Sequence, residues 1–211
     1  MKNNLYPVAK EGFKYIFAAV ILFFVFHFIS FVFLEFLSFL AILFFIYIFR
    51  NPERISQNYE VKSVSSPVDG TITTIEEIDE EGYKYKVVID SSYLDISLLR
   101  APMSAKVIYT KKQNGSRLSQ KFSSIAEKLN SFAIIVFENT TGDKIKVKHI
   151  LKQSFEEIGL YTQESKSLLQ GFRYGSMVYG TTTIYLPANF RLNVQVGSEV
   201  TASDTLMGYF S

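Results

Sequence analysis

The sequence predicts an N-terminal transmembrane α-helical hairpin followed by a mainly-β domain, a β sandwich or partly closed barrel with one or two short helices. An apolar stretch that runs from Tyr15 to Phe49 predicts the hairpin. Beyond residue 60, segments rich in β-branched and aromatic residues alternate apolar with polar positions, as half-buried strands do. Turn signals such as Glu81-Gly82 and Asn114-Gly115 separate these segments. We therefore divide the 211-residue chain into a membrane hairpin (1–55) and a β domain (60–211).

The apolar stretch is too long for one upright helix across a bilayer. A helix of about 35 residues would extend roughly 50 Å, whereas the hydrocarbon core is ~30 Å thick. Polar residues near its middle, His27, Ser30 and Glu35, predict a turn between two helices. One alternative is a hairpin that enters a single leaflet. A cleaved signal peptide is disfavoured, because the stretch far exceeds an apolar signal region of about 7–15 residues and lacks a small-residue cleavage site.

The placement of basic residues predicts the orientation of the hairpin. The predicted turn contains no lysine or arginine. Basic residues instead lie before the apolar stretch, at Lys2, Lys10 and Lys14, and after it, at Arg50 and Arg54. By the positive-inside rule, both ends of the hairpin lie in the cytoplasm. We therefore expect an inner-membrane protein with its β domain on the cytoplasmic side.

Composition excludes several other classes of protein. The chain contains no cysteine, so disulfides and thiolate chemistry are excluded. Its formal net charge is +2, without a basic run that would indicate nucleic acid as a partner. No metal site is predicted.

The strand pattern of the β domain is repetitive. The predicted strands are Thr71–Glu77, Lys84–Asp90, Lys106–Lys111, Phe132–Glu138, Lys144–Ile150, Thr181–Leu186 and Arg191–Val196. One helix is predicted at Ser119–Leu129, and Glu156–Gln170 is ambiguous. Many short strands joined by regular turns are typical of a sandwich or barrel.

Two segments resemble the half-repeats of a biotinyl/lipoyl-type barrel sandwich. They are Pro67–Ile72 and Val196–Gly208. A carrier domain of that type presents a lysine in a hairpin between its halves. Here the intervening chain is far too long, so we expect a barrel-sandwich-like fold without a carrier function.

Five sequence motifs follow one another in a recognisable order. They are Glu11-Gly12-Phe13, Phe49-Arg50-Asn51-Pro52-Glu53-Arg54, Ser66-Pro67-Val68-Asp69-Gly70, Leu94–Pro102, and a last block of Gly171–Gly175, Tyr179-Gly180 and Ile184–Pro187. Together they resemble the short bacterial and archaeal phosphatidylserine decarboxylase proenzymes, nearly from end to end. The motifs carry this resemblance by their order and spacing.

The resemblance implies chemistry in two stages. A serine activated by an aspartate attacks the carbonyl of the preceding glycine, and β-elimination then splits the chain and leaves an N-terminal pyruvoyl group. This self-generated cofactor forms a Schiff base with the amine of phosphatidylserine and accepts electrons as carbon dioxide leaves, which yields phosphatidylethanolamine. An acid reprotonates the carbanion, a role that suits histidine.

Several positions of this chain depart from that pattern. Asp69 matches the family aspartate, although Asp-Gly is also a favourable turn. Ser97 stands where the family has histidine, and Leu99 where it has asparagine. His149 stands where the family has glutamine. We favour a structural role for His149, and the alternatives are that His149 or a lysine replaces the missing acid.

The expected cleavage junction is also altered. The family pattern is Arg-Tyr-Gly, two apolar residues, Arg-Phe-Gly-Ser, and a strand that ends in Tyr-Leu-Pro. Its Gly-Ser bond aligns best with Gly180–Thr181, with one residue deleted before Tyr185. Threonine would yield a 2-oxobutyryl group, but its additional methyl crowds a tight turn. The other candidate bond, Gly175–Ser176, has the right residues at the wrong distance from the strand.

Because the departures gather at the chemistry, we favour a family member that is degenerate in catalysis and acts by binding lipid or a partner. The alternative is an active, pyruvoyl-dependent decarboxylase cleaved at Gly175–Ser176 or Gly180–Thr181. The expected ligand is membrane phosphatidylserine or a related headgroup, with Arg100 and Arg173 as candidate phosphate-binding residues. A second copy of the chain or an active relative is a further candidate partner. No cofactor other than the pyruvoyl group is expected.

Overall fold

A computed structural model describes residues 6–54, 62–119 and 123–211. The chain divides into two compact units, Met1–Glu53 and Arg54–Ser211. The boundary predicted between residues 55 and 60 lies outside the described residues.

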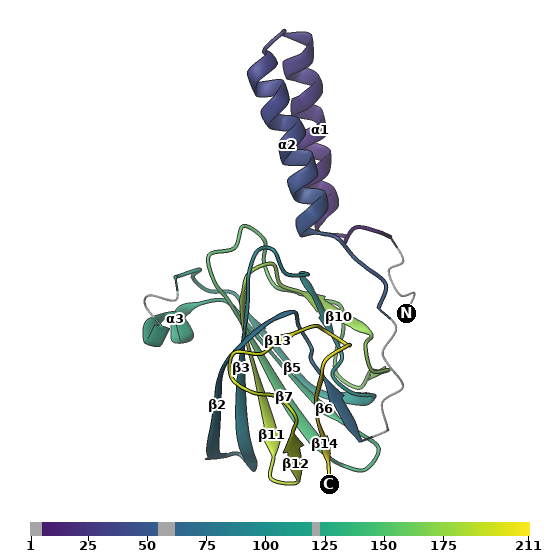
Figure 1. The fold of residues 1–211 in the computed structure, drawn as a ribbon, viewed down its shortest axis with the longest axis vertical. Helices are drawn as coiled ribbons and strands as arrows, with labels where there is room; N and C mark the ends of the chain where they lie inside the picture. The colour runs from purple at the N-terminus through teal and green to yellow at the C-terminus, as the bar shows by residue number, and fades with distance from the viewer. Residues whose placement is uncertain (1–5, 55–61, 120–122) are drawn as a thin grey trace. The chain divides into compact units, whose positions relative to one another are not determined.

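The first unit is a pair of helices joined by a short turn, α1 (Gly12–Phe28) and α2 (Val32–Ile48) (Figure 1). The first helix ends where Ser30 adopts a left-handed backbone with φ 61°. At the turn, His27 Nδ1 lies 3.0 Å from Glu35 Oε1. The polar residues of the apolar stretch therefore lie where the chain reverses.

The expected transmembrane hairpin is wrong. Each helix has 17 residues, about 25 Å at 1.5 Å per residue, which is less than a ~30 Å hydrocarbon core. Across the ranges that the structure describes, no helix is both long and apolar enough to cross a membrane. The physical reason is that residues 29–31 form a turn, which divides the apolar stretch into two short helices.

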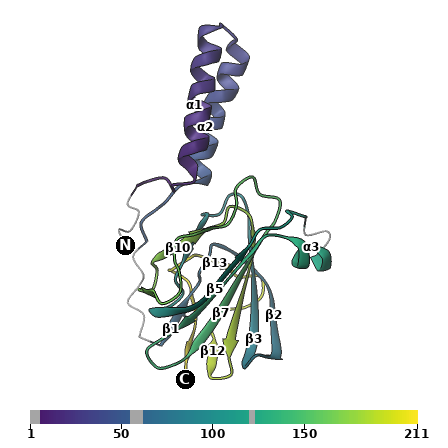
Figure 2. The same ribbon diagram turned by 180° about the vertical axis from the view of Figure 1, so that it is seen from behind.

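The second unit is mainly β. Its described residues form an eight-stranded antiparallel sheet, curved into a half-barrel, with the strand order β13-β2-β3-β11-β7-β6-β5-β9 (Figure 1). These strands are β2 (Gly70–Glu80), β3 (Tyr83–Ser91), β5 (Ala105–Gln113), β6 (Phe132–Glu138), β7 (Lys144–Leu151), β9 (Ser167–Leu168), β11 (Gly180–Pro187) and β13 (Glu199–Val200). Figure 2 shows the same sheet from behind.

Two smaller sheets complete the described part of this unit, with the strand orders β1-β14-β12 and β4-β10-β8. Their strands are β1 (Ser63–Ser65), β4 (Leu98–Arg100), β8 (Gly159–Leu160), β10 (Arg173–Ser176), β12 (Phe190–Leu192) and β14 (Leu206–Phe210). One short helix, α3 (Ser123–Leu129), lies between β5 and β6 in the chain.

Alternation along the central strands creates the core. Ala133, Ile135 and Phe137 of β6 are buried, and the residues between them are half-buried. Strand β7 follows the same period, with Val147 and Leu151 among its buried residues. Because successive side chains of a strand point to opposite faces, one face of the curved sheet encloses the apolar core.

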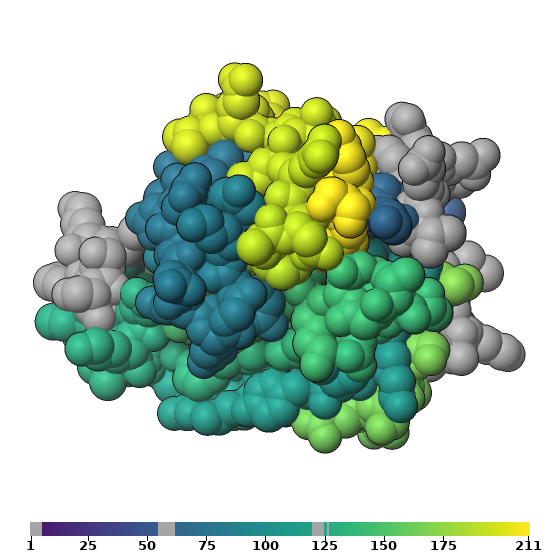
Figure 3. All heavy atoms as spheres, turned by 90° about the horizontal axis from the view of Figure 1, so that it is seen from below, coloured from purple at the N-terminus to yellow at the C-terminus, as the bar shows by residue number. Residues whose placement is uncertain are grey.

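Turn chemistry fixes the β2–β3 hairpin. Glu81 and Gly82 both have positive φ, 52° and 82°, as a two-residue hairpin turn with the twist of its strands requires. Seen from below in Figure 3, this hairpin (blue) lies beside segments near the C-terminus (yellow). Strand β3 pairs with β11, so segments about 100 residues apart in the chain form neighbouring parts of one surface.

The strand predictions are confirmed where the alternation is regular. Thr71–Glu77, Lys84–Asp90, Lys106–Lys111, Phe132–Glu138, Lys144–Ile150 and Thr181–Leu186 each lie within a strand. The prediction at Arg191–Val196 is wrong beyond Leu192, where β12 ends. Of the predicted helix Ser119–Leu129, residues 120–122 lie outside the described residues, and α3 accounts for its second half. The ambiguous segment Glu156–Gln170 contains the short strands β8 and β9.

Candidate functional site

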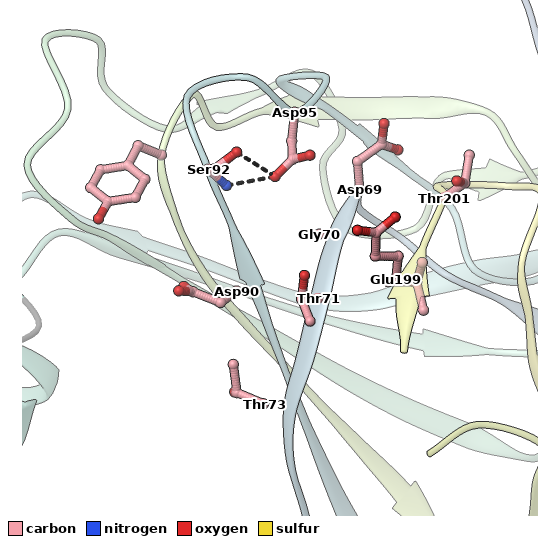
Figure 4. Close-up of a pocket in the computed structure, with 11 residues that line it drawn as sticks. Asp69, Gly70, Thr71, Thr73, Asp90, Ser92, Asp95, Glu199 and Thr201 are labelled. Atoms are coloured by element: carbon pink, nitrogen blue, oxygen red, sulfur yellow. Dashed lines mark hydrogen bonds between the residues drawn. The ribbon is translucent and has the colours of Figure 1, made fainter. Parts of the chain in front are cut away.

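A cleft of about 510 Å³ lies where β2, β3 and β13 meet (Figure 4). Its lining is polar and rich in carboxylates and hydroxyls: Asp69, Gly70, Thr71, Thr73, Asp90, Ser92, Asp95, Tyr179, Glu199, Val200 and Thr201. It includes Asp69, the residue that the motif comparison singles out. We take this cleft as the candidate functional site.

Asp69 immediately precedes β2 and is held by an ion pair. Arg54 Nη1 and Nη2 donate to the two oxygens of its carboxylate over 2.5 and 2.7 Å. The backbone N–H of Ala202 donates to Oδ1 over 2.8 Å. Both side chains are largely buried, with 17% of Arg54 and 12% of Asp69 exposed. The carboxylate is thus fixed in orientation by three donors.

The backbone around Asp69 is equally constrained. Ser91 Oγ donates to the carbonyl of Asp69 over 2.6 Å. Gly70 has φ +152°, and a Cβ placed on it would lie 2.3 Å from the carbonyl oxygen of Asp90. Glycine is therefore required next to Asp69, because β2 and β3 approach too closely for a side chain.

A second ion pair lies at the end of β3. Lys152, only 4% exposed, pairs with Asp90. Thr181 faces Asp90 across the sheet and donates from Oγ1 to Asp90 Oδ1 over 3.3 Å. The ammonium of Lys152 also lies 5.3 Å from the centre of the Tyr179 ring. Lys152, Asp90 and Thr181 therefore form one connected polar group beside the cleft.

The Gly180–Thr181 bond begins β11 between β3 and β7. A Cβ on Gly180 would lie 2.5 Å from both the Ile150 carbonyl oxygen and Met177 Sδ. The chain around this bond is therefore closely packed by a neighbouring strand and by the thioether of Met177.

Ser97, at the position of the family histidine, is 1% exposed. Its carbonyl accepts the N–H of Met177 over 2.7 Å. Within the described ranges, Ser97 Oγ has no hydrogen-bond partner. Position 97 therefore carries a buried hydroxyl next to Met177, the residue whose thioether packs against Gly180.

The alternative bond, Gly175–Ser176, lies within β10, the central strand of its sheet. Ser176 is 2% exposed, and its Oγ has no hydrogen-bond partner among the residues described. A Cβ on Gly175 would lie 2.4 Å from the carbonyl oxygen of Gly159 in β8. This bond is thus enclosed by paired strands on both sides, and neither of its residues lines the cleft.

His149 is fully buried on β7 and does not line the cleft. Its Nδ1 lies 2.8 Å from Thr182 Oγ1, and its Nε2 lies 2.7 Å from the Tyr174 hydroxyl. Burial lowers the pKa of His149 to about 3 and raises the pKa of Tyr174, because burial disfavours the charged form of each. His149 is therefore a neutral histidine in a network that connects β7, β10 and β11.

Arg100 and Arg173 are cross-strand neighbours on β4 and β10. They are 1% and 4% exposed, and neither lines the cleft. Arg100 Nη1 donates to the carbonyl of Gly171 over 3.1 Å. The structure thus places both arginines inside the domain and brings them together with each other, outside the lining of the cleft.

Sequence reasoning missed Arg54, Asp90, Lys152 and Glu199 as residues of the site. Arg54 closes a motif that was recognised, but its ion pair with Asp69 spans 15 positions of the chain. The Lys152–Asp90 pair spans 62 positions. A charged residue directly after the apolar run Val87–Ile89, namely Asp90, was the available signal.

The sequence is similar to known proteins over nearly its whole length. The family model described as phosphatidylserine decarboxylase matches residues 41–208. The phosphatidylserine decarboxylase proenzyme of Geotalea daltonii is 27% identical to this chain over 99% of both sequences. The proenzyme of Desulfotalea psychrophila is 30% identical over 96% of both sequences. Another from Geotalea uraniireducens is 28% identical over 99% of both chains.

The chain therefore belongs to the phosphatidylserine decarboxylase family, and the resemblance carried by the five motifs is confirmed. Members of this family act on a phospholipid and depend on a pyruvoyl group. The match extends across the β domain and the end of α2.

Proposed function

We propose that this chain binds phospholipid headgroups and has lost the pyruvoyl-dependent chemistry of its family. The observation that carries the proposal is the state of Asp69. Three donors, two from Arg54 and one from Ala202, occupy the carboxylate that the family uses to activate its nucleophile. Neither Ser176 nor Thr181 hydrogen-bonds to it; Thr181 donates to Asp90 instead.

The strand geometry at Thr181 supports the same conclusion. Successive side chains of a strand point to opposite faces of the sheet. If one residue is deleted from a strand while the residues after the deletion keep their places, the residues before it therefore point to the opposite face. One residue is missing between Thr181 and Tyr185 by comparison with the family pattern. By this alignment, Thr181 would present its hydroxyl on the face opposite to that of the family serine, and in the structure the hydroxyl donates to Asp90.

The acid that the reaction requires is also absent from its position. Ser97 cannot deliver a proton near neutral pH, and Met177 packs on Gly180 opposite it. Burial keeps His149 neutral in the core, where it contacts Thr182 and Tyr174, and it does not line the cleft. The residues present do not fit the formation of a pyruvoyl group by the route of the family.

The helical unit supports a lipid environment for this function. Large apolar side chains project from both helices, with Phe17 68%, Phe28 82% and Phe33 76% exposed. A helix that is apolar on all sides requires an apolar surrounding. We propose that this unit lies against lipid at the inner membrane, with the β domain on the cytoplasmic side.

A second candidate function is an active decarboxylase cleaved at Gly180–Thr181. One observation favours it: the Thr181 hydroxyl donates to a carboxylate, Asp90, that is paired with a buried lysine. In that case the nucleophile would be a threonine and its base Asp90, in place of the serine and aspartate of the family.

The intact mass of the purified, detergent-solubilised protein separates the two candidates. The proposal expects one species of 24.1 kDa that is stable over days, and no release of carbon dioxide from phosphatidylserine. Two fragments, the smaller beginning at residue 176 or 181 with a carbonyl at its N-terminus, would overturn the proposal and establish the active enzyme. A relative with the complete family motifs, purified in parallel, controls for conditions that prevent cleavage.

A further inference from the structure

The helical unit, α1 and α2, exposes large apolar side chains along its whole length. On α1 the exposed ones are Phe17, Ile21, Leu22, Phe24, Val25 and Phe28. At 3.6 residues per turn they cover roughly half of the circumference of α1, and α2 exposes a similar range of apolar side chains. A protein partner would bury one stripe of such a pair of helices, whereas liquid hydrocarbon surrounds it on all exposed sides. The surface of this unit therefore fits lipid chains.

The polar side chains near the middle of the apolar stretch are bonded within the unit. At the turn, His27 Nδ1 lies 3.0 Å from Glu35 Oε1. One turn further along α2, Ser38 Oγ donates to the carbonyl of Leu34 over 2.8 Å. Polar groups inside a lipid layer bond to one another in this way, because no water is present to bond them. The end of the unit that carries the turn therefore suits a place among acyl chains.

The opposite end of the unit combines tyrosines with basic residues. Lys14 Nζ lies 4.9 Å from the centre of the Tyr15 ring, and the Arg50 guanidinium lies 4.2 Å from that of Tyr47. The chain has no lysine or arginine between these two tyrosines. Tyrosine, lysine and arginine are typical of the layer where hydrocarbon meets headgroups, since each has an apolar body and a polar tip. The two ends of the unit thus differ in chemistry (Figure 1).

We infer that the helical unit enters a lipid bilayer turn first, with residues 29–31 among the acyl chains and the end with Tyr15 and Tyr47 in the headgroup layer. Each helix of 17 residues extends about 25 Å, against a hydrocarbon core of ~30 Å, so the turn remains inside the layer. The inference rests on the contact with lipid that is part of the proposed function. It adds the direction and the depth of that contact.

Fluorescence quenching by brominated lipids tests the inference. The chain contains no tryptophan, so one introduced tryptophan reports the depth of one position. Phe28→Trp and Phe13→Trp form a matched pair near the two ends of α1, where these phenylalanines are 82% and 49% exposed. Because both side chains are exposed, the fold is preserved in both variants. The full-length protein is reconstituted in phosphatidylcholine vesicles that carry bromine either near the headgroup or near the chain end.

The two variants should show opposite orders of quenching. The positions lie about 22 Å apart along α1, which exceeds half of the hydrocarbon thickness. We expect bromine near the chain end to quench Phe28→Trp more strongly than bromine near the headgroup, and the order to reverse for Phe13→Trp. Iodide in the aqueous phase should quench Phe13→Trp and leave Phe28→Trp unaffected.

Three outcomes would contradict the inference. Stronger quenching of both variants by bromine near the headgroup would mean that the unit lies flat at the surface. Quenching of Phe28→Trp by iodide would mean that the turn reaches water. Either result would overturn the inference and leave the contact with lipid intact. Absence of quenching by both brominated lipids in both variants would overturn the contact with lipid as well, whereas the intact mass tests the loss of chemistry separately.

Discussion

The guanidinium of Arg54 and the carboxylate of Asp69 form a bidentate ion pair, with N–O distances of 2.5 and 2.7 Å. Asp69 lines a cleft that also contains the carboxylates of Asp90, Asp95 and Glu199. Asp69 belongs to a motif that the family uses for catalysis, and Arg54 closes a motif that precedes it in the chain. The pair therefore joins two recognised motifs in one structural contact. We expect Arg54 to depend on Asp69 as its charge partner in the folded β domain.

Replacing one partner of this pair should destabilise the β domain. Asp69→Asn leaves a largely buried Arg54 without its charge partner, which costs about 3 kcal/mol in comparable buried pairs. Urea unfolding of the full-length protein measures the change. The exposed pair Lys84–Glu77 is the matched control, and Glu77→Gln should alter the free energy of unfolding by less than about 0.5 kcal/mol. Equal effects at the two sites would contradict the structure.

Acid should destabilise the protein through His149. The pKa of this histidine is about 3 in the folded protein, against 6.5 for a histidine that is not buried. Between these values the unfolded chain binds a proton that the folded chain does not, so stability falls as the pH decreases from 6.5 toward 3 and is fully present above 6.5. Melting temperatures recorded from pH 4 to pH 8 test this expectation.

The variant His149→Gln places the family residue at this position and removes the titrating group. Its amide is able to donate and accept, so bonds to Thr182 and Tyr174 can be retained. We expect a flatter dependence of the melting temperature on pH below 6.5. An unchanged slope would mean that other groups control the acid sensitivity.

The sequence predicts a strand correctly where the strand is buried on one face only, because its apolar and polar residues then alternate. Strands β6 and β7 are half-buried, so their residues alternate and the sequence reveals them. Strand β10 is buried at every position and β4 likewise, so neither shows a period of two. The helical unit was misjudged because composition reveals an apolar stretch but not where its helices end.

The candidate site shows the same division. Asp69 and the altered positions Ser97 and Thr181 could be singled out from motifs alone. The partners Arg54 and Lys152 could not, because each ion pair depends on chain segments that only the folded sheet brings together. The burial of Arg100 likewise follows from the pairing of β4 with β10, which the sequence does not indicate.

Glycine at position 70 should be essential for the geometry of the cleft. Gly70→Ala would place a methyl 2.3 Å from the Asp90 carbonyl oxygen, at a φ of +152° that side chains disfavour. We expect a loss of about 2–4 kcal/mol in the free energy of unfolding, since the obstacle is backbone rather than a flexible side chain. Thr71→Ala, at the exposed neighbouring position, is the control and should have a small effect. Comparable losses for both variants would argue against the close approach of β2 and β3.

Thr181→Ser tests whether the methyl group of threonine is what prevents self-cleavage. Serine removes that steric obstacle but leaves the hydroxyl on the face of Asp90, where Thr181 Oγ1 now lies 3.3 Å from the carboxylate. Asp69 remains bound to Arg54, and position 97 remains a serine. We therefore expect the variant to stay a single chain in intact-mass measurements over several days, as the parent should.

A fragment from Thr181→Ser that begins at residue 181 would show that the chain retains the capacity for cleavage and lacks only the right nucleophile. In that case Asp90→Asn in the same background should abolish the fragment, because Asp90 is the carboxylate that accepts the hydrogen bond of the residue 181 hydroxyl. Asp69→Asn should leave the fragment unchanged if Asp69 acts only through its ion pair with Arg54. The comparison of these two aspartates therefore decides which carboxylate still belongs to the chemistry of the junction.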